Sequence, residues 1–338
     1  MSKCAIGVDL GGTNLRIALV GDAGKILDKI SLETEVARGP AHVVDEMCVA
    51  IRDLAAKHRS EGTLCGIGVG VPGIIDMQAG MVLQSPNFPG WHDYPVRNEI
   101  ERRLGTPVIL ENDANAAALG EKWLGAASAV EDMCMVTLGT GVGGGIVLHG
   151  RIWHGMSGMA GELGHITIEP DGVLCGCTNR GCVEQYASAK AIKRMVKEAI
   201  ATGQAPTLAQ AMNANPDIAP ETIYQMAMHG DKAAQQVFDR VGRALGILFG
   251  CLINIFNLPM YVVGGGVANA WDAFSPAMFE ETLRRSYIYK ATAPPASVGV
   301  KDGNKPDESS SRQSTIITQA TLGSDAGLIG AARLPMMQ

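Results

Sequence analysis

Residues 4–20 read CAIGVDLGGTNLRIALV, an apolar strand, a glycine-rich turn and a second apolar strand. This pattern predicts a β-hairpin. The glycines would let backbone N–H groups approach a phosphate, and the polar residues after them would add side-chain donors. A plain hairpin turn explains the stretch equally well, because Gly-Gly turns are common. The candidate phosphate contacts in and beside the turn are Asp9, Gly11, Gly12, Thr13 and Asn14.

The same pattern returns at residues 133–149, MCMVTLGTGVGGGIVLH. Gly139, Thr140 and Gly141 occupy the turn, as the glycines and threonine do in the first copy. A repeated hairpin predicts a duplicated α/β unit in which each half offers one phosphate-facing loop. Neither copy is a Walker A loop, since no Gly-Lys-Ser/Thr follows, and neither matches G-x-G-x-x-G opening a helix. We therefore expect two related halves to hold the phosphates of a nucleotide.

Residues 161–184, GELGHITIEPDGVLCGCTNRGCVE, place one histidine close to three cysteines. His165, Cys175, Cys177 and Cys182 supply one nitrogen and three sulfur donors, the ligand set of a closed tetrahedral structural zinc site. A disulfide between Cys175 and Cys177 would close a small, strained ring. Three unrelated buried thiols would not explain the nearby histidine. We favour structural over catalytic zinc, because protein atoms would fill all four positions.

Further polar residues border these motifs. Glu162 and Glu184 flank the candidate zinc loop, which would hold them on a rigid platform. The strand PVILEND delivers Asn112 and Asp113 at its C-terminal end, where ligands gather in α/β sheets. Either residue could instead be the N-cap of the following helix. Asn87 and Trp91, in the irregular stretch QSPNFPGWHDYPV, could rim a pocket or be an ordinary polar loop residue and an anchor residue.

Apolar periodicity predicts helices at residues 41–58, 187–201 and 231–256. After the last of them, YVVGGGVANAW predicts a buried strand, a third glycine-rich turn and a helix start. Residues 291–314 are rich in proline, serine and charge, which predicts an exposed loop. The glycines of the third turn are Gly264, Gly265 and Gly266.

The whole chain has 338 residues, which predicts two domains. A hydrophobic content of 46% with 18% charged residues is typical of a soluble globular protein. The net charge of -6 argues against a nucleic-acid partner. The N-terminus shows no export signal, and the longest apolar run, residues 244–256, is too short to span a membrane. We expect a cytoplasmic, reducing environment for the eight cysteines.

The ordered motifs DLGGTN, ENDAN, LGTGVGGG, GELGH with CGCTNRGCVE, and GGGV resemble those of the ROK family of sugar kinases, within the actin-like ATPase superfold. The resemblance implies an α/β, ribonuclease H-like fold of two lobes with ATP and sugar in the cleft between them. The small lobe would comprise residues 1–116 and 318–338, and the large lobe residues 117–317. A helix near 324–334 would return to the first lobe. Some family members carry an N-terminal DNA-binding domain, and we expect none here because the sequence starts directly at its first loop.

The resemblance also assigns roles to residues. Asp113 would be the catalytic base, and His165 would bind zinc through one ring nitrogen and a sugar hydroxyl through the other. Asp9 would lie in the outer shell of Mg²⁺. Thr178 departs from the family pattern, which usually has glycine after the second cysteine, so the local turn is in question. The sugar contacts would be Asn112, Asp113, Glu162, His165 and Glu184, with Asn87 as a further candidate, and the nucleotide contacts would be Gly11, Gly12, Thr13, Asn14, Gly139, Thr140, Gly141, Gly264, Gly265 and Gly266.

The expected reaction is ATP-dependent phosphorylation of the 6-hydroxyl of D-glucose, with Mg²⁺ and a structural Zn²⁺. The segments SPNFPGW and CGCTNRGCVEQYAS resemble the glucose-phosphorylating branch of the family. Kinases of N-acetylmannosamine, fructose or another hexose are the alternatives within the family. A polyphosphate-dependent kinase and a sugar sensor without turnover are others. The resemblance also suggests a homodimer.

Overall fold

The computed structural model describes residues 3–85, 88–294 and 314–338. The chain forms two compact units. The first consists of Met1–Met135, Gly144–Gly161 and Ala320–Gln338, and the second of Val136–Gly143 and Glu162–Gln319. This division does not test the lobe boundaries expected from the sequence, residues 1–116 with 318–338 and residues 117–317, which stay a prediction.

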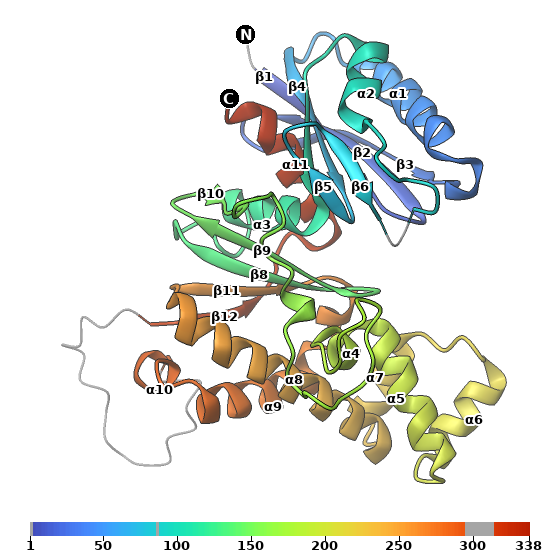
Figure 1. Ribbon diagram of the computed structural model, residues 1–338, viewed down its shortest axis with the longest axis vertical. Coiled ribbons are helices and arrows are strands. Elements are labelled where there is room, and N and C mark those ends of the chain that lie inside the picture. Colours follow the sequence, from blue (N-terminus) through green and yellow to red (C-terminus); the bar gives the residue numbers. More distant parts are fainter. Residues whose placement is uncertain (1–2, 86–87, 295–313) are drawn as a thin grey trace. The chain divides into compact units, whose positions relative to one another are not determined.

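A five-stranded sheet contains the N-terminal hairpin (Figure 1). Its strand order is β3-β2-β1-β4-β7, in which β2 pairs antiparallel with both β1 and β3, while β1, β4 and β7 run parallel. The strands are β1 (Lys3–Leu10), β2 (Asn14–Gly21), β3 (Ile26–Glu33), β4 (Thr63–Val71) and β7 (Val108–Asn112), and a separate antiparallel pair is formed by β5 (Ile74–Asp76) and β6 (Met81–Gln84). The hairpin predicted over residues 4–20 is therefore confirmed as β1 and β2.

The two faces of this sheet carry side chains of different size, because successive residues of a strand point to opposite faces. Large residues such as Ile6 and Val8 pack in one core with α1 and α2. On the other face Ala5 packs against α11, and a Cβ at Gly7 would lie 2.0 Å from the carbonyl oxygen of Leu328. Only glycine lets α11 approach so closely. The helices of this unit are η1 (Val36–Arg38), α1 (Pro40–Lys57), α2 (Val96–Leu104), α3 (Asp113–Trp123), η4 (Gly323–Asp325) and α11 (Ala326–Met336).

A second five-stranded sheet has the order β10-β9-β8-β11-β12. When the strands of each sheet are numbered from one to five along the chain, both sheets have the spatial order third, second, first, fourth and fifth. This shared order supports the duplication predicted from the repeated hairpin. The strands are β8 (Met133–Leu138), β9 (Val142–Leu148), β10 (Arg151–Ile152), β11 (Met260–Gly264) and β12 (Ile316–Gln319).

Helices make up most of the second unit, and α8 packs along α9. Close contact requires Gly242 of α8, where a Cβ would lie 2.2 Å from the carbonyl oxygen of Phe274. Ala291 and Thr292 end a short helix rather than begin a loop, and residues 295–313 of the expected loop lie outside the described residues. The helices are η2 (Leu163–His165), α4 (Glu184–Ala187), α5 (Ala189–Ala201), α6 (Pro206–Ala214), α7 (Pro220–Met228), α8 (Lys232–Phe256), η3 (Gly266–Ala270), α9 (Trp271–Arg285) and α10 (Tyr289–Thr292).

The length and hydropathy of these helices bear on membrane insertion. Within the described part of the chain, no helix combines the length and apolar character needed to cross a bilayer.

Candidate functional site

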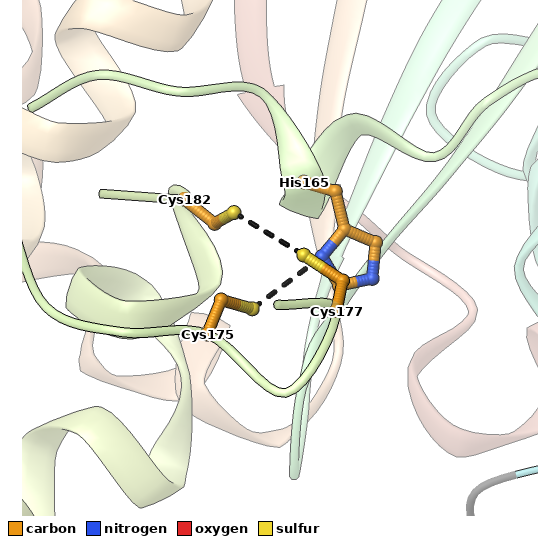
Figure 2. A group of neighbouring side chains, drawn as sticks. All are labelled: His165, Cys175, Cys177 and Cys182. Carbon is orange, nitrogen blue, oxygen red and sulfur yellow. Dashed lines mark hydrogen bonds between the residues drawn. The ribbon is translucent and has the colours of Figure 1, made fainter. Parts of the chain in front are cut away.

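The four metal-ligating side chains expected from the sequence come together in the second unit (Figure 2). The donor atoms of His165, Cys175, Cys177 and Cys182 all lie within 4.8 Å of one another. His165 Nδ1 is 3.6 Å from Cys175 Sγ, and the Sγ atoms of Cys177 and Cys182 are 3.7 Å apart. Zinc–sulfur bonds of about 2.3 Å and zinc–nitrogen bonds of about 2.0 Å in a tetrahedron require donor separations of roughly 3.5 to 3.8 Å. The cluster can therefore hold a zinc ion, and none of its cysteines forms a disulfide.

The backbone of the zinc loop is tightly constrained. Gly181 has φ of 69°, and a Cβ there would lie 1.6 Å from the carbonyl oxygen of Glu169. Thr178, the departure from the family pattern, has φ of 72°. Its N–H donates to the carbonyl oxygen of Cys175 at 3.0 Å. The turn therefore forms with threonine in the left-handed region, which is strained for a β-branched residue.

The two ring nitrogens of His165 face different partners. Nδ1 points toward the cysteines (Figure 2), and Nε2 lies 3.9 Å from a carboxylate oxygen of Glu162. The side chain of Glu162 is 59% exposed and that of His165 is 36% exposed. This geometry leaves the Nε2 side of the ring accessible while the Nδ1 side faces the cysteine thiols.

Glu184, at the start of α4, contacts the second glycine-rich turn. Its Oε2 accepts the N–H of Val142 at 3.0 Å, and a Cβ at Gly141 would lie 2.3 Å from that oxygen. The carbonyl oxygen of Gly139 accepts the N–H of Ala189 at 2.9 Å. The turn that holds Thr140 is thus fixed to the segment that follows the zinc loop.

The third glycine-rich turn also needs its glycine for close packing. Gly265 has φ of 86°, and a Cβ there would lie 2.5 Å from the carbonyl oxygen of Leu138 at the end of β8. A Cβ at Gly266 would meet open space, so packing does not require a glycine at this position. Gly264 ends β11, and Gly266 begins η3.

The first glycine-rich turn lies in the first unit, between β1 and β2. The N–H of Gly11 donates to the carbonyl oxygen of Asn14 at 2.9 Å, and Thr34 binds both ends of the turn, donating its N–H to the carbonyl oxygen of Thr13 and its hydroxyl to that of Gly11. Gly12 is partly accessible there, and Thr13 and Asn14 are exposed.

Asp9 forms an ion pair that sequence analysis did not identify. Its carboxylate accepts a hydrogen bond from Arg16, its neighbour across the β1–β2 hairpin. Arg16 also donates through Nη1 to the carbonyl oxygen of Ser324 at 2.6 Å. Asp9 is thereby linked to the segment that precedes α11. The alternation of the strands, which places residues 9 and 16 opposite one another, was the available signal.

The strand β7 leads directly into α3, and the structure separates the roles of the two residues at this junction. Asn112 is the N-cap: its Oδ1 accepts the N–H groups of Ala114 at 2.9 Å and Asn115 at 3.2 Å. Asp113 is the first residue of the helix, and its Oδ1 accepts the N–H of Ala114 at 2.9 Å. A helix N-terminus favours the ionised form of a carboxylate at this position.

A buried carboxylate beside this junction also escaped sequence analysis. Glu111 is 1% exposed and accepts hydrogen bonds from Asn115 Nδ2 at 3.0 Å and His154 Nε2 at 2.7 Å. A glutamate inside the apolar strand PVILE could have indicated a buried carboxylate. The sequence did not identify its partner, His154, which lies 43 residues further along the chain.

Two residues of the QSPNFPGWHDYPV stretch have different outcomes. Asn87 lies outside the described residues. Trp91 is fully buried, and its ring centroid lies 4.8 Å from that of Phe88 and 5.4 Å from that of Tyr94. Trp91 therefore anchors the loop in the core and does not rim a pocket.

The sequence model of the ROK family matches residues 5–337. The chain belongs to the ROK family. A glucokinase of Halalkalibacterium halodurans is 37% identical over 335 residues, covering 98% of this chain and 95% of the relative. A glucokinase of Thermotoga maritima is 36% identical over 330 residues, covering 97% and 96% of the two chains.

Solved structures agree with this family assignment. A ROK family glucokinase from Streptomyces griseus, crystallised with glucose and AMPPNP, is similar with a TM-score of 0.77 and 32% identity, covering 99% of this chain and all of that one. The actin-like ATPase fold expected from the sequence is thus confirmed for this ROK protein.

Proposed function

We propose that the protein is a glucokinase that transfers the γ-phosphoryl group of ATP to the 6-hydroxyl of D-glucose, giving glucose 6-phosphate and ADP. The observation that carries the proposal is similarity to glucokinases along almost the whole chain. The relative from Streptomyces griseus binds glucose and an ATP analogue in its crystal structure. The position of Asp113 at the junction of β7 and α3 supports its candidacy as the carboxylate that takes part in the reaction.

Phosphoryl transfer requires a hydroxyl in line with the γ-phosphate and a group that accepts its proton. Asp113 is our candidate for this base, because it stands at the first turn of α3 with one oxygen already oriented by the N–H of Ala114. The ordered carboxylate would accept the proton of the 6-hydroxyl as the phosphoryl group is transferred. Asn112, the N-cap, would contact the sugar beside it.

Hexose recognition is assigned to polar groups around the zinc loop. Glu162 and Glu184 would accept hydrogen bonds from ring hydroxyls, and His165 would use Nε2 for the same purpose while Nδ1 binds the metal. Zinc, when bound, would neutralise the cysteine thiolates and fix the loop, as in other structural sites. Asn87 stays a candidate sugar contact.

Nucleotide binding is assigned to the three glycine-rich turns. Backbone N–H groups of residues 11–14, 139–141 and 264–266 would face the phosphates. Mg²⁺, when bound with ATP, would neutralise charge on the phosphates. Asp9 is our candidate for the outer shell of that ion, and Arg16 holds its carboxylate in place.

Other parts of the proposal concern the setting of the reaction. We propose a homodimer from the family resemblance, and a cytoplasmic location because all eight cysteines are free, as a reducing compartment requires. A sugar sensor without turnover is the main alternative of a different class. It would bind hexose and nucleotide without producing ADP.

A panel of hexoses with ATP and Mg²⁺, in which ADP release is followed, tests the proposal. We expect kcat/KM for glucose to exceed that for mannose, fructose, glucosamine and N-acetylmannosamine, because a site built around each hydroxyl penalises altered ones. Preference for N-acetylmannosamine or fructose would replace glucose as the substrate and leave the kinase mechanism standing. Binding without ADP release would support the sensor, and turnover with polyphosphate but not ATP would change the donor.

A further inference from the structure

Glu111 is a buried carboxylate two residues before the proposed base. It lies in β7, and only 1% of its side chain is exposed. Burying a carboxylate is costly unless it is paired and fully hydrogen-bonded. Among the described residues, its ion-pair partner is His154.

Three donors converge on this carboxylate. The N–H of Asn112 lies 2.9 Å and Nδ2 of Asn115 lies 3.0 Å from Oε1, while Nε2 of His154 lies 2.7 Å from Oε2. Asn112 and Asn115 lie on either side of Asp113 in the chain. The carboxylate of Glu111 therefore holds the strand-to-helix turn on which Asp113 stands.

His154 is itself held at the start of a folded-back segment. It follows β10 and Trp153, and the N–H of Trp153 donates to the carbonyl oxygen of Ile146 at 2.7 Å. The carbonyl oxygen of His154 accepts the N–H of Ala160 at 3.2 Å, which closes residues 154–160 into a loop. The imidazole, 39% exposed, can exchange its proton with solvent.

We propose that His154 is a positioning residue for the phosphoryl transfer proposed above: its imidazolium pairs with Glu111 and thereby fixes the turn that carries Asp113. The inference rests on the proposed function for its catalytic consequence. Loss of the proton would leave a buried carboxylate without a counter-charge. The turn would then loosen, and the unpaired negative charge would lie close to the place where the anionic nucleotide reacts.

The charges around His154 agree with this role. The hydrogen bond that His154 donates to the Glu111 carboxylate raises the pKa of His154 above its ordinary value, while burial opposes the shift. Of the elements that pack against β7 or β10, α3 carries Asp113, Glu121 and Lys122, and β10 itself carries Arg151. The other charged groups on elements in contact with β7 are Asp76 of β5, Arg97, Glu99, Glu101, Arg102 and Arg103 of α2, and Arg333 of α11. Because the folded-state pKa is raised, the ion pair is complete below pH of about 6.5 and is lost as the pH rises through the higher folded-state value.

The test is the pH profile of kcat for wild type and His154→Gln, which keeps a donor but cannot titrate. We expect wild-type kcat to fall about fivefold as the pH rises through the His154 pKa, with KM for glucose changed less than about twofold. His154→Gln should lack this step, and His154→Ala should lack it as well, with kcat about tenfold below the low-pH wild-type value throughout the pH range. His149→Asn, which removes an exposed histidine of the same unit, is the control and should keep the wild-type profile.

A second readout is independent of the hexose. NMR titration of the His154 imidazole should give a pKa above the ordinary histidine value in wild type, and Glu111→Gln should bring it down. An ordinary pKa in wild type, or an alkaline step that persists in His154→Gln, overturns the inference. If no hexose is phosphorylated while the imidazole pKa is raised, the proposed function and its catalytic consequence fail, and the ion pair alone stands.

Discussion

Asp113 and Asn112 are adjacent in the chain, yet their side chains have separable roles. Asn112 caps α3 through two backbone N–H groups, so the helix does not depend on Asp113 for its N-cap. We therefore expect Asp113→Asn to lower kcat by about 10²- to 10⁴-fold, the range of a general base, with the melting temperature and glucose affinity nearly unchanged. Kinetics, thermal unfolding and calorimetric glucose binding check this. Retention of most of the wild-type kcat would show that Asp113 has no role as the base.

Thr178 is a second test at the scale of one residue. Its φ of 72° is unfavourable for a β-branched side chain and is readily adopted by glycine. We expect Thr178→Gly to raise the free energy of unfolding by about 1 kcal/mol, the relief of strain less the added chain entropy. Thermal and denaturant unfolding measure the change. Thr202→Gly is the control, because Thr202 lies at a helix C-cap with an ordinary φ, and this change should not stabilise the protein. A loss of stability in Thr178→Gly would contradict the prediction and would mean that contacts of the threonine side chain outweigh its backbone strain.

The zinc loop illustrates how an element too short for a hydrophobic core is ordered. Its ligands lie within one stretch of chain, and the loop has little regular structure besides η2 and isolated bridges. We expect one zinc per chain in wild type, and Cys177→Ala should lose the metal and weaken glucose affinity by at least about tenfold, because the metal would hold the proposed sugar-contacting residues of the loop in place.

Metal analysis and calorimetric glucose titration check this expectation. Cys251→Ala is the matched control, because Cys251 is an exposed free cysteine of the same unit on α8. It should keep both zinc and glucose affinity. Zinc-free wild-type protein, or unchanged affinity in Cys177→Ala, contradicts the proposed role of the loop.

At the scale of the whole molecule, the long connection after α10 is the clearest test of what folding requires. The residues on its two sides are joined: the N–H of Thr315 donates to the carbonyl oxygen of Thr292 at 2.8 Å, and their hydroxyls lie 2.8 Å apart. Loop length contributes only weakly to closure entropy. Replacing residues 297–311 with a short glycine-serine linker should therefore change the melting temperature by less than about 2 °C and leave kcat unchanged. A large loss of either would show that these residues pack against folded parts of the protein.

Local sequence determined the features that depend on short spacing. His165 and the three cysteines lie in one stretch of chain, so residue type and spacing were enough to predict that they cluster. Each glycine-rich turn joins or follows strands that are continuous in the chain, and was predicted for the same reason. The N-terminal hairpin and the helix that became α1 followed from alternating and helical periodicity in the same way.

Tertiary structure decided the pairings between distant residues. The spacing of residues in the sequence did not show whether Asn112 or Asp113 caps α3. The path of the backbone at the end of β7 makes Asn112 the N-cap. Glu111 and His154, 43 residues apart, form an ion pair only because the folded first unit brings β7 close to the chain after β10. Local periodicity records which face of a strand is buried but not which distant side chain will lie against it, because that depends on how the elements pack.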